Sequence, residues 1–171
     1  TRKVVIDRGA THAVKLGSPV VNEGGVLGQV TRVYPLSSEV TLLNDKDAAI
    51  PVLNTRTQQR SAAFGNPDGE GLELRFLTGN ADVQVGDVMT TSGVDGVYPA
   101  GMPVAKVVNV VRSADTGFAK IDLQLSANTE NLRHVLVLDP VDLQLPPREE
   151  VPVDPPRAAS AASAAKKGGR R

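Results

Sequence analysis

The 171-residue chain carries 19 basic and 19 acidic residues, so its formal net charge is zero. A neutral chain has no overall attraction to nucleic acid or to an anionic membrane, and an aromatic content of 3% disfavours base stacking. The absence of cysteine excludes disulfides, thiolate metal sites and thiol catalysis.

Hydrophobic residues make up 40% of the chain and are mainly Val, Leu, Ile and Ala, a composition typical of β-sheet cores. In the first part of the chain, Gly24 and Gly25 separate two apolar runs and supply the positive φ angles of a tight hairpin. Gly28, inside the second arm, predicts a bulge or a close backbone approach. Strands are expected at residues 3–7, 20–21, 26–33, 40–43, 49–54 and 61–64.

An acidic cluster, residues 44–47, follows the fourth of these runs. It lacks the glycine and the distal glutamate of an EF-hand, so it predicts a solvated turn and not a calcium loop. Further on, Leu72, Leu74 and Phe76 alternate with Glu73 and Arg75, as expected of a half-buried strand.

The later strands show two patterns. Residues 119–125 alternate between apolar and polar, which predicts another half-buried strand. Residues 107–111 are apolar on both faces, which predicts a strand covered on both sides. A short helical turn is expected at 127–131 and a last strand at 132–138.

The most densely patterned segment covers residues 85–107, where four glycines and two prolines interrupt short apolar runs. It predicts strands joined by tight turns. The expected turn residues are Gly86, Asp87, Thr91, Ser92, Gly93, Gly96, Pro99 and Gly101. Val94, Val97, Tyr98 and Met102 gather around the same turn, and they either close the end of a barrel or offer apolar area to a partner or to a second copy.

The spacing of about ten short strands predicts an all-β fold of two small β-barrel domains. We place the first barrel at residues 1–52, with 128–139 as the segment that would complete it, and the second at 53–127. Six of the 12 prolines lie between residues 140 and 156. Residues 140–171 are therefore expected to form a disordered, basic Pro/Ala/Ser-rich tail.

Catalytic and metal sites find little support. Ser92 with His12 or His134 would give a secreted chymotrypsin-like serine hydrolase, the alternative function, but the Gly-X-Ser-X-Gly context is missing. Asp87 and Asp95 could form an acid/base pair, yet both neighbour glycine, where aspartate commonly bonds the local backbone. The two histidines form no metal pattern, so we expect no metal, no cofactor and no catalytic residue.

Two stretches carry a family resemblance. Residues 91–104 contain Thr-Ser-Gly followed by Tyr-Pro-Ala-Gly, and the N-terminal part contains Asp-Arg-Gly at residues 7–9 and Leu-Gly-Gln-Val at 27–30. Together with the Gly86-Asp87 step, they resemble the MreC family of bacterial rod-shape-determining proteins over residues 3–138. Tyr98 stands where phenylalanine is usual in that family, and Ala105 where glycine is frequent.

The resemblance implies two β-barrel domains on the periplasmic side of the inner membrane, preceded by a coiled coil and a transmembrane helix upstream of Thr1. It further implies a non-enzymatic scaffold of the cell-elongation machinery that maintains rod shape. The expected partners are a second copy, in a homo-oligomer or filament, a class B penicillin-binding protein transpeptidase, and other membrane proteins of the rod complex.

Overall fold

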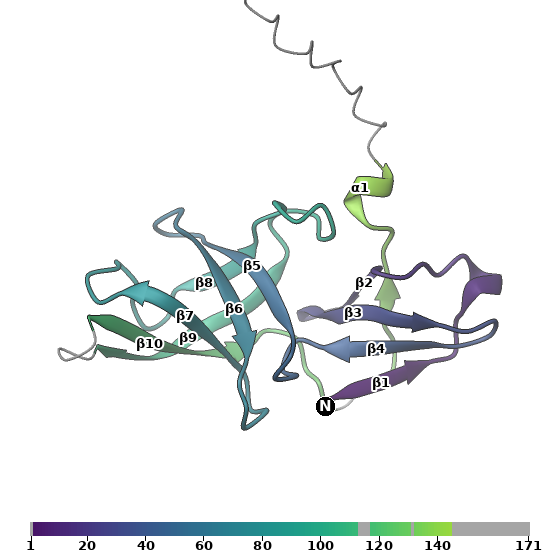
Figure 1. Cartoon of the computed structure of the whole chain (residues 1–171), viewed down its shortest axis with the longest axis horizontal. Helices are drawn as coiled ribbons and strands as arrows, with labels where there is room; N and C mark the ends of the chain where they lie inside the picture. The colour runs from purple at the N-terminus through teal and green to yellow at the C-terminus, as the bar shows by residue number, and fades with distance from the viewer. Residues whose placement is uncertain (1, 113–116, 131, 145–171) are drawn as a thin grey trace, which may run out of the picture.

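The computed structural model describes residues 2–112, 117–130 and 132–144. Nearly all of its regular structure is β-strand (Figure 1), as the sequence predicts. The elements are β1 (Lys3–Ile6), the 3-10 turn η1 (Ala10–His12), β2 (Pro19–Asn22), β3 (Gly25–Val33), β4 (Ser38–Leu42), β5 (Ala49–Asn54), β6 (Arg60–Gly65), β7 (Leu72–Thr78), β8 (Val88–Thr91), β9 (Pro103–Arg112), β10 (Phe118–Leu125), β11 (Leu136–Val137) and α1 (Val141–Gln144).

The strands form two units. The first sheet is five-stranded and open, in the order β1-β4-β3-β2-β11, with β1 and β11 at its edges. The second unit is a closed barrel of six strands in the order β10-β7-β6-β5-β8-β9. Figure 1 shows the two units side by side, with the barrel at the left. The all-β prediction is confirmed, and one of the two units is closed by strand pairing.

The expected boundary between the units needs one correction. Strand β5 pairs with β6 and β8 inside the barrel, so residues 49–52 belong to the second unit and not to the first. Its partners lie later in the chain, and sequence order alone does not reveal them. At the other end of the chain, β11 pairs with β2 and thus extends the first sheet.

The C-terminal predictions also change in part. Residues 141–144 form the helical turn α1, although they were expected within the disordered tail, and residues 145–171 lie outside the described structure. A backbone contact with the barrel holds this turn, since the amide of Asp142 donates to the carbonyl oxygen of Gly96. The described residues 127–130 form bends and not a helical turn, and only residues 136–137 of the expected last strand are paired.

The predicted N-terminal hairpin is confirmed as β2 and β3, which pair from Pro19 opposite Gln29 to Asn22 opposite Gly25. Gly28 lies where a Cβ would meet the carbonyl oxygen of Thr41 at 2.0 Å. The predicted close backbone approach is therefore present. Next to it, the register shifts between Val20 and Val21.

Side-chain burial follows the alternation in β10, where Ala119, Ile121 and Leu123 point into the core. In β9, by contrast, the expectation of cover on both faces is wrong. Val108 is 46% exposed and Val111 is 49% exposed, because each strand of a closed barrel has one inner and one outer face.

One hydrophobic cluster joins the two units. It contains Val21, Val26 and Leu43 of the first unit together with the inward side chains of the barrel. The β2–β3 turn packs closely against the barrel, since a Cβ on Gly25 would lie 2.3 Å from the carbonyl oxygen of Pro103. The first sheet and the barrel therefore share an interior at their junction. A smaller cluster fills the rest of the first sheet.

Candidate partner-binding surface

Thr91 organises the loop that follows β8. Its hydroxyl donates to the carbonyl oxygen of Pro99 and accepts the amide of Met102 at 2.9 Å, while the amide of Gly101 donates to its carbonyl oxygen at 2.9 Å. One residue thus fixes both ends of the loop. Within the loop, Asp95 Oδ1 accepts the amide of Val97 at 3.2 Å. Aspartate here bonds the local backbone, as in an Asx turn.

Four glycines of this region adopt positive φ angles, which residues with a Cβ rarely do. The values are 98° for Gly86, 72° for Gly93, 67° for Gly96 and 87° for Gly101. The loop conformation therefore depends on glycine at these positions.

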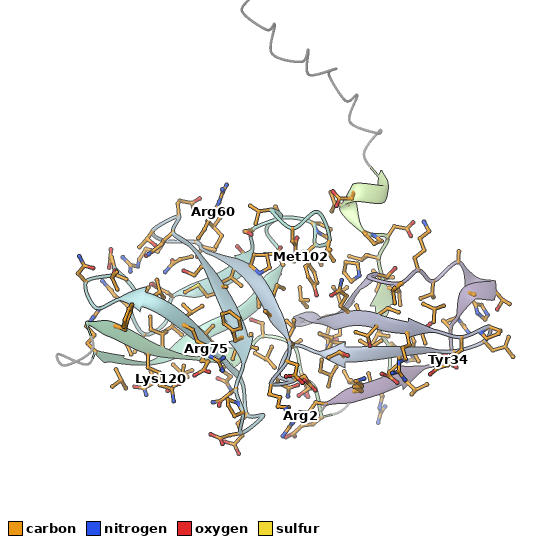
Figure 2. The ribbon with its side chains drawn as sticks, in the orientation of Figure 1. Arg2, Tyr34, Arg60, Arg75, Met102 and Lys120 are labelled. Carbon is orange, nitrogen blue, oxygen red and sulfur yellow. The ribbon has the colours of Figure 1, made fainter. Side chains whose placement is uncertain are left out.

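The four apolar residues around this loop divide into two groups. Tyr98 is buried at 4% exposure within the shared core, and Val97 and Met102 are half-buried against that core. Figure 2 shows Met102 at the junction of the two units. Val94, in contrast, is 58% exposed. Of the two alternatives, Tyr98 in this conformation fits closure of the barrel end, because its ring belongs to the interior.

Burial also affects the Tyr98 hydroxyl. Removal from water disfavours the phenolate and raises the pKa of Tyr98 well above its usual range, and the nearby Asp95 carboxylate acts in the same direction. The hydroxyl thus stays neutral at any ordinary pH, consistent with a packing role.

Asp87 holds a polar network that the sequence does not reveal. Its carboxylate accepts hydrogen bonds from Asn54 Nδ2 at 2.7 Å, from Arg56 Nε at 2.7 Å and from the amide of Gln84 at 3.0 Å. Arg56 also pairs with Asp82 at 2.9 Å. The Arg56 guanidinium, together with Asn54, lowers the pKa of Asp87 to about 2 although burial opposes this. This network ties the β5–β6 turn to the start of β8.

The hydrolase triad is not assembled. Ser92 Oγ is buried and makes no hydrogen bond with any described residue. His12 lies in η1 beside Thr11 and Gly9, and His134 lines a groove of the first unit. Asp87 and Asp95 likewise bond different partners and form no pair. No group of three or more His, Asp or Glu residues suited to a metal ion occurs within the described ranges.

The acidic cluster at residues 44–47 is a turn of which only the second half, Lys46 and Asp47, is solvated. Asn44 is 3% exposed and Asp45 is 1% exposed. Asn44 Nδ2 donates to the carbonyl oxygen of Gly69 at 3.1 Å, and Asp45 accepts the amides of Arg2 and Asp47. The first half of the turn is buried because the first sheet and the barrel meet there.

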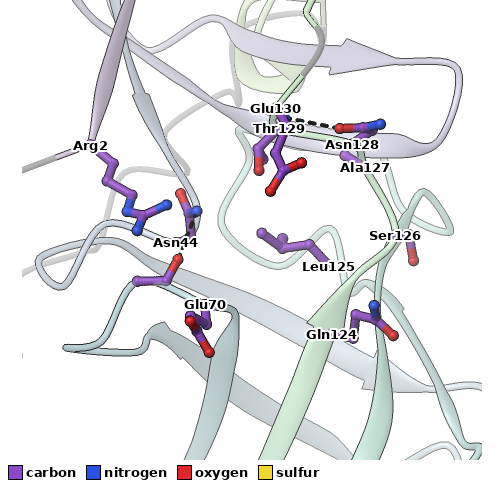
Figure 3. Close-up of a pocket in the computed structure, with 11 residues that line it drawn as sticks. Arg2, Asn44, Glu70, Gln124, Leu125, Ser126, Ala127, Asn128, Thr129 and Glu130 are labelled. Atoms are coloured by element: carbon purple, nitrogen blue, oxygen red, sulfur yellow. Dashed lines mark hydrogen bonds between the residues drawn. The ribbon is translucent and has the colours of Figure 1, made fainter.

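A polar pocket of about 570 Å³ opens beside that turn (Figure 3). Arg2, Glu70 and Glu130 line it together with the chain that leaves β10. Charges of both signs share its walls. The groove described next also has charged residues of both signs, Asp7 and Arg133 among them, but adds a row of apolar side chains.

An apolar groove of about 780 Å³ lies along β1, between this edge strand and residues 132–137. Val4, Ile6 and Val135 line it and are only half-buried, so the interior of the first unit is open along this side. Arg133 and His134 also line the groove and are exposed.

Figure 1 shows β1 along the lower edge of the first sheet. Because the second unit is a closed barrel, the free strand edges belong to the first sheet, within the described part of the chain.

The fold and this surface define an all-β module: a closed barrel fused through one core to a sheet with a free edge. The family described as "Rod shape-determining protein MreC, barrel core" matches residues 1–139. The chain belongs to the MreC family of cell shape-determining proteins.

Two curated relatives illustrate the match. The cell shape-determining protein MreC of Escherichia coli K12 is 39% identical over 136 residues, which cover 80% of this chain and 37% of that protein. MreC of Haemophilus influenzae is 35% identical over 144 residues, which cover 84% of this chain and 41% of that protein. The chain thus spans about two fifths of the length of these relatives.

Solved structures agree with the fold. The crystal structure of MreC from Pseudomonas aeruginosa superposes with a TM-score of 0.76 at 36% identity, covering 80% of this chain and 88% of the other. MreC in a complex with a penicillin-binding protein, PBP2, from Helicobacter pylori superposes with a TM-score of 0.58 at 25% identity, covering 71% of this chain and 76% of the other. No helix within the described residues is long and apolar enough to cross a membrane.

Proposed function

We propose that this chain is the periplasmic part of a non-enzymatic scaffold that self-associates and holds cell-wall synthases at the inner membrane during elongation. Two relatives support the proposal. One solved MreC, 26% identical to this chain, is described as the major periplasmic domain of a cell shape-determining filament, and the Helicobacter pylori MreC is in a complex with PBP2. By analogy, a class B transpeptidase and a second copy are the partners of this chain, with other rod-complex membrane proteins.

The free edge of β1 beside the apolar groove is the observation that carries the proposal. An edge strand presents unpaired backbone groups that an extended segment of a partner can bond, while a neighbouring apolar groove selects its side chains. The closed barrel offers no such edge. We therefore place the contact on the first sheet, with exposed Val94 as a second candidate on the barrel loop.

The pairing of β1 with β4 identifies the backbone groups involved. The amide of Leu42 donates to the carbonyl oxygen of Arg2, and Lys3 lies opposite Thr41 in the register. Hydrogen-bonded pairs alternate along an antiparallel ladder, so Val4 bonds to β4, whereas Lys3 and Val5 direct their backbone groups to the free edge. Val5 is also 71% exposed.

Substitution of Val5 by proline tests this contact. Val5→Pro removes one edge donor while leaving the β1–β4 ladder intact, since proline is tolerated on the solvent side of an edge strand. We expect at least tenfold weaker binding to the extracytoplasmic part of an elongation transpeptidase, measured by biolayer interferometry, and a loss of self-association in analytical ultracentrifugation.

Two further variants serve as controls. Val5→Thr keeps the backbone amide and should bind as the parent chain does. Val94→Asp tests whether the barrel loop contributes to binding. Unchanged binding by Val5→Pro, with a normal circular dichroism spectrum, would reject the edge contact. Loss of binding in Val94→Asp alone would move the site to the loop.

A further inference from the structure

The polar pocket beside Asn44 is built from three segments that lie far apart in the chain. The β4–β5 turn supplies Asn44, the β6–β7 turn supplies Gly69 and Glu70, and the end of β10 with the chain after it supplies residues 124–130. Ligand sites occur preferentially where two structural units meet, and the volume of about 570 Å³ lies within the range of small-molecule sites. The position and size of the pocket therefore suit a small ligand.

Hydrogen bonds hold the chain after β10 in place, so this wall of the pocket is already formed. The amide of Ser126 donates to the carbonyl oxygen of Val104 at 2.9 Å. The side-chain amide of Asn22 donates to the carbonyl oxygen of Asn128 at 3.1 Å. Asn128 Oδ1 in turn accepts the amide of Glu130 at 2.9 Å (Figure 3). The wall is thus fixed to the first sheet and to the barrel at once.

Asn44, on the opposite wall, has a buried acceptor without a donor. Its Nδ2 donates to the carbonyl oxygen of Gly69 at 3.1 Å, which fixes the orientation of the amide, because the reverse orientation would bring two oxygens together. Oδ1 is then buried and has no hydrogen-bond partner in the described part of the chain. A buried polar atom that lacks a partner is unfavourable and requires an explanation. A ligand that donates an N–H to Oδ1 supplies one.

The charged residues of the pocket indicate which other groups the ligand carries. Two carboxylates, those of Glu70 and Glu130, and one guanidinium, that of Arg2, line the walls. Figure 3 shows Arg2 and Asn44 on one side of the pocket and Glu130 on the other. Carboxylates attract protonated amines, and a guanidinium binds a carboxylate through two parallel hydrogen bonds. The walls therefore match a molecule with two amines and one carboxylate.

We propose that this pocket binds a basic amino acid, free or at the carboxyl end of a peptide. Arg2 binds the carboxylate of the ligand, Glu70 and Glu130 bind its amino groups, and one N–H of the ligand donates to Asn44 Oδ1. Leu125 supplies apolar surface for the methylene groups of the ligand. This inference goes beyond the scaffold function proposed above and does not depend on it.

Nuclear magnetic resonance of the ¹⁵N-labelled full chain, titrated with L-lysine, tests the proposal. We expect saturable shifts of the Asn44 side-chain amide and of the backbone amides of Gly69 and Glu130, with a dissociation constant of about 1 mM. Cadaverine lacks the carboxylate and hexanoate lacks the amines, so each should bind at least about tenfold more weakly. The peptide Gly-Gly-Lys distinguishes the two sources: tighter binding than lysine indicates a peptide end, and weaker binding indicates the free amino acid.

Charge-neutralising variants test the assigned contacts. Arg2→Gln and Glu130→Gln should each weaken lysine binding about tenfold, because each removes one charge-assisted hydrogen bond. Asp7→Asn is the matched control, since its side chain is 93% exposed and lies outside the pocket, and it should bind lysine as the parent chain does. Circular dichroism checks the fold of each variant. An Asn44 side-chain signal that lysine leaves unmoved, as when water alone bonds Oδ1, or equal binding of lysine and cadaverine, would overturn the proposal.

Discussion

At the scale of single residues, Asp87 has the most consequential environment. Its side chain is 6% exposed and bonds Asn54, Arg56 and the backbone of Gln84. A buried carboxylate is stable only when its oxygens are hydrogen-bonded or paired. The aspartate that the sequence predicts as a turn residue therefore fixes two turns of the barrel against each other.

Removing the Asp87 carboxylate should lower the stability of the fold. Asp87→Ala leaves the buried Asn54 amide without its acceptor, so we expect a loss of about 2–3 kcal/mol in the free energy of unfolding. Asp82→Ala is the matched control, because Asp82 pairs with the same arginine but its side chain is 64% exposed, and it should cost less than about 1 kcal/mol. Urea denaturation followed by circular dichroism measures both, and equal losses would contradict this account.

The same carboxylate makes stability depend on pH. Folding lowers the pKa of Asp87 from 3.8 to about 2, chiefly through Arg56. The stabilisation is complete above the unfolded-state pKa and disappears as pH falls from about 4 to about 2. Because Arg56 is partly exposed and screened, we expect about 1–2 kcal/mol. Between pH 5 and pH 2, the parent chain should lose more stability than Asp87→Ala, and parallel curves would refute the assignment.

At the scale of elements, the first sheet depends on the close approach of two strand backbones. Strand β3 passes β4 with Gly28 against the carbonyl oxygen of Thr41. A backbone oxygen inside a sheet cannot move aside as a flexible side chain can. Glycine at this position therefore serves the pairing of two strands and not a turn.

Gly28→Ala should consequently destabilise the fold by more than about 2 kcal/mol, as β3 and β4 must separate locally. Gly117→Ala provides the comparison, since its positive φ angle carries a strain of about 1–2 kcal/mol but a Cβ there meets nothing within 4 Å. Thermal unfolding of both variants measures the difference. A smaller effect for Gly28→Ala than for Gly117→Ala would argue against the close approach.

At the scale of the whole molecule, the shared core makes the two units one cooperative structure. Val26, at 0% exposure, belongs to the first sheet yet packs within the cluster of the barrel. Units that share an interior cannot unfold separately without exposing it. The open sheet thus depends on the barrel for part of its core.

We therefore expect a single unfolding transition. In Tyr34→Phe, the remaining Tyr98 reports on the barrel core, and its fluorescence midpoint should coincide with the far-ultraviolet dichroism midpoint of all strands. Val26→Ala should shift both midpoints together and cost about 2 kcal/mol. Two separate transitions, or a shift in only one signal, would show that the units unfold independently.

Much of the fold follows from local sequence. Alternation predicts β10, and the paired glycines predict the β2–β3 hairpin, because side-chain period and positive φ angles are properties of short segments. The motifs near Tyr98 and Gly28 also carry the family resemblance. Each of these signals can be read from a short segment of the chain.

The tertiary structure decided what depends on distant partners. It placed residues 49–52 in the barrel, buried Tyr98, joined Asp87 to Arg56 across 31 residues and brought residues 138–142 onto the loop at Gly96. Strand order, ion pairing and burial arise from contacts that close only when the chain is folded. Composition and periodicity do not specify such contacts, and for that reason the free edge of β1 could not be located from sequence.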